Sequence, residues 1–464
     1  MQTHVLLLVA AGVLVLHGAR AFAFAPALDA RALRGAVDWS PQEWRGRSTL
    51  RRPVKVGAPP DGQRRVGAAV ATRALANAAP FSETSDQRLV RLLQRDITDL
   101  DHRLMAAPYE IGADAPDSAS CFSLQELLSE GGRGPLSARL CEELRSNHFA
   151  IVKPSAAGTE ALQGVWPAAR GFFDLPAAHK EAAAGRMRKA EGNVGIIGWG
   201  TMPDDNEFLE LRVAAGGGIV PAGLDESVPG FTAATDAARR ELFALGRTVI
   251  AAVATSVGMQ ADALVQLLDD GSRLSEGQWS STQHRLCLYH ADSSVPFEAH
   301  TDTTFLTLIP CASIAGLEVW TQASGWVRPE EHADSEGAVV VMPGEFLQVL
   351  TGGSFSAAVH RVTRFGRRED TSGGGAGGGG GGGMAGEAAP TVGQTRLSAP
   401  LLVRGVKETA VRASDLLLAN AGADEDAADE AGVLRRQLAR LDGVTLYDLH
   451  RVLVSPPPPP GCSE

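Results

Sequence analysis

The sequence has 464 residues, of which 44% are hydrophobic, and its 54 acidic and 43 basic side chains give a formal charge of −11. This length allows two or three ordinary domains with a sizeable core, and the acidic balance argues against nucleic acid as a partner. The five cysteines are scattered and lack CxxC spacing, which argues against a disulfide framework or a zinc site and predicts reduced, mostly buried thiols.

The first 79 residues have the composition of targeting segments. An apolar run over residues 5–16 is too short to span a bilayer, and an A-x-A pattern ends at Ala21, so we expect a signal peptide at 1–21. Residues 22–79 are rich in Arg and Ala and predict a disordered, transit-like segment. The Phe22 after the cleavage site resembles the bipartite presequence of algae with complex plastids, which implies a plastid location. A secreted or ER-lumen protein with a disordered pro-region is the alternative. No membrane attachment is expected after removal of the presequence.

The next two segments are predicted to be mainly helical. Residues 80–115 predict an amphipathic helix and linker, which either packs on the catalytic body or binds a partner. Residues 116–270 predict a mostly helical domain. Within it, residues 231–268 suggest a long helix that ends near Gly271. Residues 193–205 suggest a Gly-rich loop that fits no phosphate-binding fingerprint.

After Gly271 the pattern changes to short apolar runs separated by Gly, Pro, Ser and Asp. Regular short strands with turn signals are typical of an all-β sandwich or barrel, such as a jelly roll. We therefore predict a mainly β core over residues 271–405. Its expected strands lie in residues 283–292, 299–309, 316–321, 337–344, 345–352 and 356–365.

Two further segments follow the core strands. Residues 367–395 contain a nearly pure glycine run and predict a disordered insertion that cannot bury enough apolar surface to order itself. Residues 395–405 restore strand character. Residues 406–464 predict a helical segment and a Pro-rich, solvated tail.

His300 and Asp302 stand two residues apart in a predicted strand, so their side chains would leave on the same face. With His360 on a later strand they supply two imidazoles and one carboxylate. Such a set leaves about half of an octahedral coordination sphere open, which suits non-haem Fe(II). A His-x-Asp pair alone is weak evidence, because structural histidines produce many such pairs.

Six motifs occur in the order known from one enzyme family. They are R-L-C-L-Y-H (285–290), H-T-D (300–302), G-L-E-V-W (316–320), L-T-G-G-S-F-S-A-A-V-H-R-V (350–362) and R-L-S (396–398), and a sixth, G-W-V-R-P (325–329), lies in the same order between the third and the fourth. The order resembles the 2-oxoglutarate and Fe(II)-dependent dioxygenases, in the subgroup of isopenicillin N synthase and the plant hormone and flavonoid oxygenases. The resemblance covers about residues 121–405. It implies a distorted double-stranded β-helix (jelly-roll) core with an N-terminal helical domain.

The resemblance also implies the activity and the metal site. His300, Asp302 and His360 would be the iron ligands. The enzyme would oxidise, by default hydroxylate, a small organic metabolite with O₂ and 2-oxoglutarate, releasing succinate and CO₂. Fe(II), the 2-oxoglutarate cosubstrate and ascorbate as an accessory reductant are the implied cofactors, and a monomer is expected.

For the cosubstrate, the resemblance implies that Arg396 takes the distal carboxylate of 2-oxoglutarate as a bidentate fork. Ser398 would add a hydroxyl, and Tyr289 would be the third contact. Cys287 stands where the family has Asn, and its thiol cannot replace the hydrogen bonds of an amide. Gly344-Glu345 stands where the family has Gly-Asp, which suggests a variation of a turn.

Two alternative functions stay open. One is an isopenicillin-N-synthase-like oxidase that uses O₂ without 2-oxoglutarate, and the other is a non-catalytic relative that keeps the fold for binding. Several side chains also have a plain structural interpretation. His284 and His290 are expected to be structural or rim residues, Arg361 to make a structural salt bridge, and Trp199, Phe297 and Phe305 to line the substrate pocket or simply to pack.

Overall fold

The computed structural model describes residues 113–114, 120–131, 134–189, 195–202, 206–290, 297–332, 334–363, 395–418 and 430–454. The predicted signal peptide, the transit-like segment, most of residues 80–115, the glycine insertion and the Pro-rich tail lie outside the described residues. Within the described part, no helix combines the length and apolarity needed to cross a membrane. The four cysteines described, Cys121, Cys141, Cys287 and Cys311, are free thiols, as predicted.

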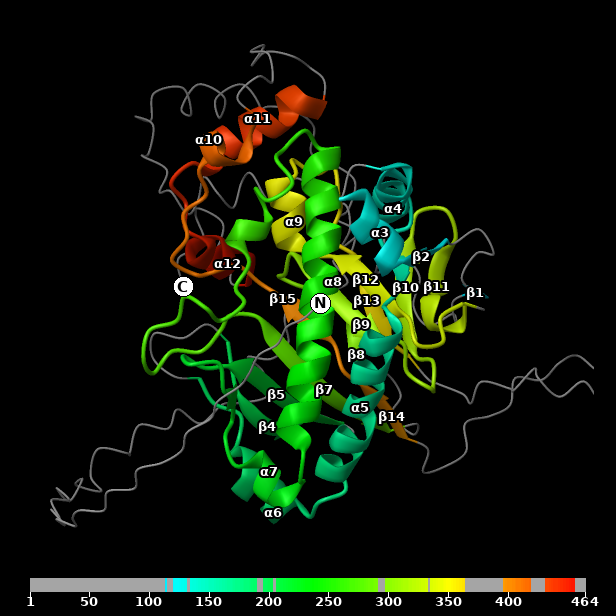
Figure 1. Ribbon diagram of the computed structural model, residues 1–464, viewed down its shortest axis with the longest axis vertical. Coiled ribbons are helices and arrows are strands. Elements are labelled where there is room, and N and C mark those ends of the chain that lie inside the picture. Colours follow the sequence, from blue (N-terminus) through cyan, green and yellow to red (C-terminus); the bar gives the residue numbers. More distant parts are fainter. Residues whose placement is uncertain are drawn as a thin grey trace, which may run out of the picture. The chain divides into compact units, whose positions relative to one another are not determined.

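The strands form two sheets (Figure 1). In the larger sheet the spatial order is β2 (Cys121–Ser123), β3 (Ala150–Lys153), β12 (Val339–Pro343), β9 (Leu306–Pro310), β15 (Leu401–Val403), β7 (Gln283–His290), β5 (Glu207–Val213) and β4 (Gly198–Thr201). At its margin β14 (Thr395–Ser398) pairs with β7 and β6 (Ile219–Val220) pairs with β5. The smaller sheet has the order β1 (Ala113–Asp114), β11 (Gly325–Arg328), β10 (Leu317–Thr321), β13 (His360–Val362) and β8 (Phe297–His300).

The alternation of side chains along the strands separates two cores. Val340 and Met342 of β12 pack with Leu317 and Val319 of β10 in the cluster between the sheets. The alternate side chains of β12, Val339 and Val341, point to the opposite face and belong to the cluster that also contains side chains of the helices. The described sheets are therefore the two faces of a distorted double-stranded β-helix, flanked by helices, as the sequence predicts.

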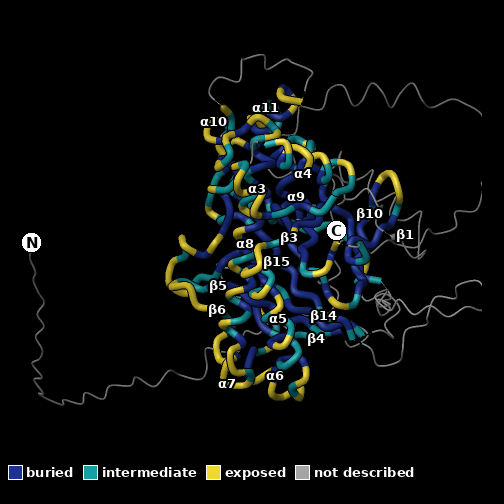
Figure 2. The backbone as a smooth tube through the Cα atoms, turned by 45° about the vertical axis from the view of Figure 1, so that its right-hand side comes forward, coloured by how far each residue is buried: buried dark blue, intermediate teal, exposed yellow. Residues whose placement is uncertain are grey.

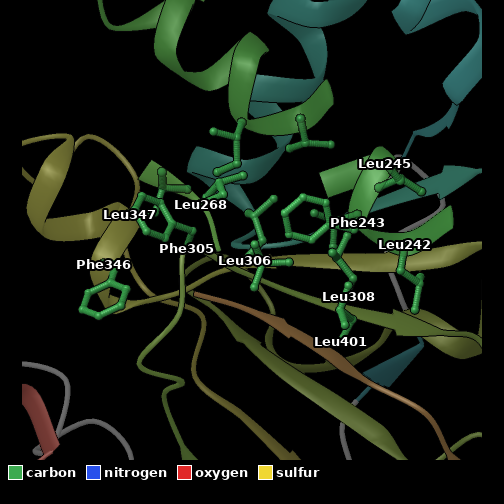
Figure 3. Packing of buried hydrophobic residues seen from close by; sticks show 14 of the residues in the cluster. Leu242, Phe243, Leu245, Leu268, Phe305, Leu306, Leu308, Phe346, Leu347 and Leu401 are labelled. Atoms are coloured by element: carbon green, nitrogen blue, oxygen red, sulfur yellow. The ribbon is translucent and has the colours of Figure 1, made fainter. Parts of the chain in front are cut away.

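Helices cover the other face of the larger sheet. They are α3 (Leu124–Glu130), α4 (Pro135–Ser146), α5 (Ala156–Phe173), α6 (Ala177–Ala184), α7 (Leu224–Ser227) and α8 (Phe231–Ser256). Figure 1 shows the long helix α8 running across the strands, and Figure 3 shows Leu242, Phe243 and Leu245 of α8 beside Leu308 and Leu401 of the sheet. Figure 2 shows that the sheet strands are mostly buried while helices such as α6 and α7 carry exposed outer faces.

The chain after the core strands adds α9 (Glu345–Leu350), α10 (Ala413–Leu416), α11 (Glu430–Leu441) and α12 (Leu446–Val454). Both α11 and α12 contact α9. Since β5 of the predicted helical domain pairs with β7 of the predicted β core, one sheet continues across the expected boundary at residue 270. That boundary stays a prediction.

Four local predictions are wrong, and one of them, a single strand over residues 299–309, is interrupted between His300 and Leu306. Residues 345–352, expected as a strand, form helix α9, because Gly344 and the acidic Glu345 begin a turn that buries Phe346, Leu347 and Leu350. The long helix ends at Ser256 rather than near Gly271, and Gly258 follows it with a φ of 78°. The expected Gly-rich loop contains strand β4, which pairs with β5.

Two histidines, the buried His284 and the half-buried His450, tie stability to pH. Burial, with a smaller effect of Arg239, lowers the pKa of His284 to about 4, and burial next to Arg404 lowers the pKa of His450 to about 3. In the unfolded chain both titrate near their ordinary pKa of about 6.5. Below that pH the unfolded state takes up protons that the folded state does not, so the stability present above pH 6.5 is lost as the pH falls toward 4.

We therefore expect the free energy of unfolding to fall by about 1.4 kcal/mol per pH unit for each histidine across this window. Urea titrations between pH 7 and pH 4.5 measure the slope. His450→Gln removes one titrating group, so the dependence of the unfolding free energy on pH should decrease by the contribution of one histidine. An unchanged slope in that variant would show that His450 is not held neutral by the fold.

Candidate metal centre and adjoining cavity

The structure brings His300, Asp302 and His360 together at the end of the smaller sheet. Strands β8 and β13 are antiparallel, and their register places His360 opposite His300. Asp302 Oδ1 lies 3.6 Å from Nε2 of His300, and Asp302 Oδ2 lies 3.5 Å from Nε2 of His360. One candidate ligand atom from each of the three lies within 4.8 Å of the others. Their role as iron ligands stays a prediction, which this geometry suits.

The reason for the convergence differs from the one expected. Residues 299–309 were predicted as one strand, but β8 ends at His300 and β9 begins only at Leu306. Asp302 therefore lies in the loop between two sheets, and the loop rather than strand alternation turns its carboxylate toward the imidazoles.

Both imidazoles are oriented by backbone carbonyl groups. Nδ1 of His300 lies 2.8 Å from the carbonyl oxygen of Glu298, and Nδ1 of His360 lies 3.1 Å from that of Ala358. A proton on each Nδ1 donates to the carbonyl and leaves the lone pair of Nε2 directed at the centre. This is the tautomer that a metal ligand requires.

The protonation states also suit a metal. Burial, assisted by the neighbouring His360, lowers the pKa of His300 to about 4. Burial alone would raise the pKa of Asp302, but the two imidazoles and the Thr307 hydroxyl lower it below its usual range. At neutral pH His300 is neutral and Asp302 is ionised, so neither side chain would have to lose a proton to bind a divalent cation.

A second layer of contacts fixes the loop that carries Asp302. The Thr307 hydroxyl donates to Asp302 Oδ2 at 2.6 Å. The Glu345 carboxylate accepts from the hydroxyls of Thr301, at 2.9 Å, and Thr303, at 2.7 Å, on either side of the ligand. The backbone N–H of Glu345 donates to the carbonyl of Asp302 at 2.9 Å. Glu345 therefore clamps the loop from both sides.

Gly344 permits this close approach. A β-carbon at Gly344 would collide with the hydroxyl and the carbonyl oxygen of Thr304. The Gly-Glu pair is thus the start of helix α9 and the support of the metal loop. The sequence signalled it only as a departure from Gly-Asp.

We expect Glu345→Ala to weaken Fe(II) binding about ten-fold, since partners of metal ligands typically contribute at that level. Glu345→Gln should retain most of the affinity, because each threonine hydroxyl can rotate to accept from an amide. Anaerobic calorimetry with Fe(II), or Mn(II) as a substitute, gives the dissociation constants. Glu336→Ala, which changes an exposed glutamate, is the matched control. Equal affinities for Glu345→Ala and this control would contradict the clamp.

A cavity adjoins the metal centre between the two sheets. Its walls include the triad together with Tyr289, Arg396 and Ser398. The register explains the grouping, because Arg396 lies opposite Tyr289 and Ser398 lies opposite Cys287 on paired strands. The structure thus brings all the predicted site residues to one cavity.

The guanidinium of Arg396 is not free to bind a carboxylate through two nitrogens, contrary to what the resemblance implied. Its Nη2 donates to both carboxylate oxygens of Glu330, at 2.9 and 3.0 Å, and its Nε donates to the carbonyl of Ile314 at 3.0 Å. Among the residues that the structure describes, Nη1 has no partner, and it is buried. An arginine that lines the cavity with an orphaned, buried N–H group fits an oxygen ligand there, such as a carboxylate.

Tyr289 and Cys287 form the wall beside Arg396. The Arg396 guanidinium lies 5.5 Å from the centre of the Tyr289 ring. Burial raises the pKa of Tyr289 well above its usual value, and burial raises the pKa of the Cys287 thiol to about 12. Both groups are neutral at physiological pH, so Tyr289 offers a hydroxyl donor and Cys287 an unreactive thiol.

The sequence did not identify a second arginine in the cavity wall. Nε of Arg285 donates to Glu210 at 2.7 Å, and the Glu210 carboxylate is fully buried between β5 and β7. Arg285 shares its strand face with Cys287 and Tyr289, so the two-residue period of β7 is the signal that could have placed it. Glu330 had no comparable signal, and Glu345 was marked only by the departure from Gly-Asp.

Of the side chains for which the sequence allowed a structural or a pocket-lining role, most are structural and one lines the cavity. His284 is buried on the helix side of β7, and Arg361 forms the expected structural salt bridge to Glu318 at 2.7 Å. Trp199 donates to Glu207 at 2.7 Å, and Phe305 packs on Phe346 in the helix-side core, with ring centres 5.5 Å apart. Phe297 alone of the three aromatic candidates lines the cavity, 4.6 Å from the His300 ring.

Comparisons with known proteins agree with this geometry. Residues 281–369 match the family described as the 2OG-Fe(II) oxygenase superfamily. Gibberellin 3-beta-dioxygenase 4 of Arabidopsis thaliana is 23% identical over 43% of this chain and 57% of its own length. Flavonol synthase/flavanone 3-hydroxylase of Matthiola incana is 24% identical over 44% of this chain and 68% of its own length. The chain thus spans little more than half of the first of these relatives.

Among solved structures, a full-length Neurospora crassa protein in complex with alpha-KG and 5-formyluracil is 18% identical, with a TM-score of 0.49 over 71% of this chain and 99% of the Neurospora chain. The segment matched by the family model contains His300, Asp302 and His360, whose side chains converge in the structure. Over residues 281–369 the chain is therefore similar to the 2OG-Fe(II) oxygenase superfamily.

Proposed function

We propose that the protein is an Fe(II)- and 2-oxoglutarate-dependent dioxygenase that hydroxylates a small organic metabolite. In this reaction O₂ supplies one oxygen atom to the succinate formed from 2-oxoglutarate, with loss of CO₂, and the other to the substrate. The observation that carries the proposal is the presence, in one cavity, of a two-histidine, one-carboxylate set and of a buried arginine with an unpartnered N–H group.

The residues divide the work between two ends of the cavity. His300, Asp302 and His360 would hold Fe(II), which when bound supplies the activation of O₂. The carbonyl partners of the two imidazoles and the Thr307 hydroxyl keep the three ligand atoms directed at one point. At the other end Arg396 Nη1, with the hydroxyls of Ser398 and Tyr289, would bind the distal carboxylate of the oxo acid.

The names of the curated relatives support a small organic substrate, because they are a gibberellin 3-beta-dioxygenase, a flavonol synthase/flavanone 3-hydroxylase and a leucoanthocyanidin dioxygenase. Beside the metal centre the cavity is lined by apolar side chains, among them Phe297 and Val362. Such a lining excludes water from the metal and suits a substrate with apolar surface.

The test is turnover of 2-oxoglutarate. Purified protein with Fe(II), ascorbate and O₂ should form succinate and CO₂ in equal amounts, slowly without substrate and faster when a candidate substrate is added. The proposal is contradicted if Fe(II) binds at the triad but neither 2-oxoglutarate binding nor succinate formation is detected.

An oxidase that uses O₂ without the oxo acid is the second candidate. The ion pair between Arg396 and Glu330 favours it, because the pair leaves the far end of the cavity without the net positive charge that a dicarboxylate prefers. Consumption of O₂ by the Fe(II)-loaded protein in the absence of 2-oxoglutarate, on addition of a substrate, distinguishes this candidate from the first.

We further propose that the protein acts in the plastid of an alga with complex plastids, on the basis of the presequence over residues 1–79. A fluorescent protein fused behind these residues should enter the plastid of such an alga. Secretion of the fusion would support the alternative location.

A further inference from the structure

Glu330 lies wholly inside the protein, at the end of the cavity that Arg396 lines. Its side chain is fully buried, in a short 3-10 turn, η4 (Pro329–Glu331), directly after strand β11. Burial of a carboxylate is costly unless hydrogen bonds and an opposite charge compensate for the lost water. The contacts of Glu330 show how this cost is offset.

The Glu330 carboxylate joins a backbone loop to the cavity arginine. The N–H groups of Gly316 and Leu317 donate to its Oε2, both at 2.9 Å, and the N–H of Ala312 donates to its Oε1 at 3.3 Å. Nη2 of Arg396 bonds both oxygens. The same loop supplies the carbonyl of Ile314 that accepts from Arg396 Nε. Loop, glutamate and arginine are therefore one rigid unit.

This unit decides what Arg396 can offer to a ligand. With Nε and Nη2 both bonded inside the protein, Nη1 is the nitrogen left to meet an acceptor in the cavity. The charge of the guanidinium is also matched by that of Glu330, at a place where little water screens either group. A carboxylate bound at Nη1 would gain from Arg396 and be repelled by Glu330.

We propose, on the basis of the function proposed above, that Glu330 sets the affinity for the dicarboxylate cosubstrate by orienting Arg396 and partly cancelling its charge. Glu330 is thus a positioning residue that acts through Arg396 and keeps the binding of 2-oxoglutarate weak. The expected consequence is specific. A substitution that removes the negative charge of Glu330 but keeps the shape of its side chain strengthens binding of 2-oxoglutarate.

Glu330→Gln is the variant that tests this. Its amide oxygen can still accept from Gly316 and Leu317, so the loop keeps its main anchor. We expect the dissociation constant of 2-oxoglutarate, measured by anaerobic calorimetry on the Fe(II)-loaded protein, to fall at least about five-fold. The affinity for Fe(II) should not change, because none of the contacts of Glu330 involves the metal triad. Glu331→Gln is the matched control, since Glu331 makes its ion pair with Arg328 and its neutralisation should leave both constants unchanged.

A second measurement uses the unaltered protein and guards against a variant that does not fold. The affinity for 2-oxoglutarate is compared with that for 2-oxopentanoate, which lacks the distal carboxylate. A charge-assisted bond from an uncompensated arginine would favour 2-oxoglutarate by up to about 100-fold. With Glu330 opposing it, we expect a preference below about 20-fold, and a larger one overturns the proposal.

The outcomes separate this proposal from the proposed function. Unchanged or weaker 2-oxoglutarate binding by folded Glu330→Gln overturns the role of Glu330 while the dioxygenase function stands. Binding by Glu330→Gln but not by the unaltered protein supports the role of Glu330 in its strongest form. Absence of binding in both, with Fe(II) bound, overturns both.

Discussion

Asp302→Ala is expected to abolish Fe(II) binding at the triad and with it all turnover of 2-oxoglutarate. The carboxylate is the only anionic member of the set, and its two oxygens lie 3.6 and 3.5 Å from the imidazole nitrogens that it would share a metal with. Loss of a partner behind a ligand typically costs 10–100-fold in affinity, so loss of the ligand itself should cost more than about 100-fold. Calorimetry with Fe(II) or Mn(II) measures the affinity, and succinate formation measures the activity. His300→Ala should behave in the same way.

The fold should survive this change. The backbone hydrogen bond from Glu345 to the carbonyl of Asp302 does not depend on the side chain, so we expect the melting temperature of the metal-free variant to stay within a few degrees of that of the unaltered protein. Glu298→Ala, which changes an exposed residue of the same segment, is the control and should retain both binding and turnover. Full Fe(II) affinity in folded Asp302→Ala would show that the metal binds elsewhere.

Arg396→Ala should have two large effects at once. It removes the N–H group expected to bind the distal carboxylate, so 2-oxoglutarate affinity should fall by at least about ten-fold, as loss of a charge-assisted bond predicts. It also leaves Glu330 buried with no opposite charge. Breaking a buried ion pair from one side costs about 3–5 kcal/mol, and the three backbone N–H donors of Glu330 place the expected loss of unfolding free energy near the lower end, about 3 kcal/mol.

A second substitution separates the two effects. Glu330→Gln combined with Arg396→Ala removes the unpaired charge, and it should restore more than about half of the lost stability while 2-oxoglutarate binding stays weak. Urea unfolding gives the stability, and calorimetry gives the affinity. Unaltered 2-oxoglutarate affinity in folded Arg396→Ala would remove Arg396 from the cosubstrate site.

The sequence was informative where one local pattern has one structural solution. Short apolar runs between turn residues predicted the strands around residues 283–292, 316–321, 337–344 and 395–405, and β7, β10, β12, β14 and β15 lie there. It failed at residues 345–352, because a short apolar run fits a strand or a buried helix equally well. Only the packing of α11 and α12 on α9 shows that this run is helical.

The functional site was predictable in its residue types but not in its connections. The triad and Arg396 were found from motifs, whereas the partner of Arg396 lies 66 residues away and belongs to no motif. A salt bridge of that kind is fixed by the register of distant strands and by burial, neither of which a single sequence displays. The same holds for Glu345, whose side chain reaches the metal loop from 42 and 44 residues away.

The central claim is that one cavity binds Fe(II) at the triad and 2-oxoglutarate between the metal and Arg396. Anaerobic titration of the Fe(II)-loaded protein with 2-oxoglutarate, followed by calorimetry and by the visible charge-transfer absorption of a chelated iron, tests it directly. We expect one 2-oxoglutarate per chain, with no absorption band in Asp302→Ala and a much weaker titration in Arg396→Ala. Fe(II) binding at the triad with no uptake of 2-oxoglutarate would contradict the account.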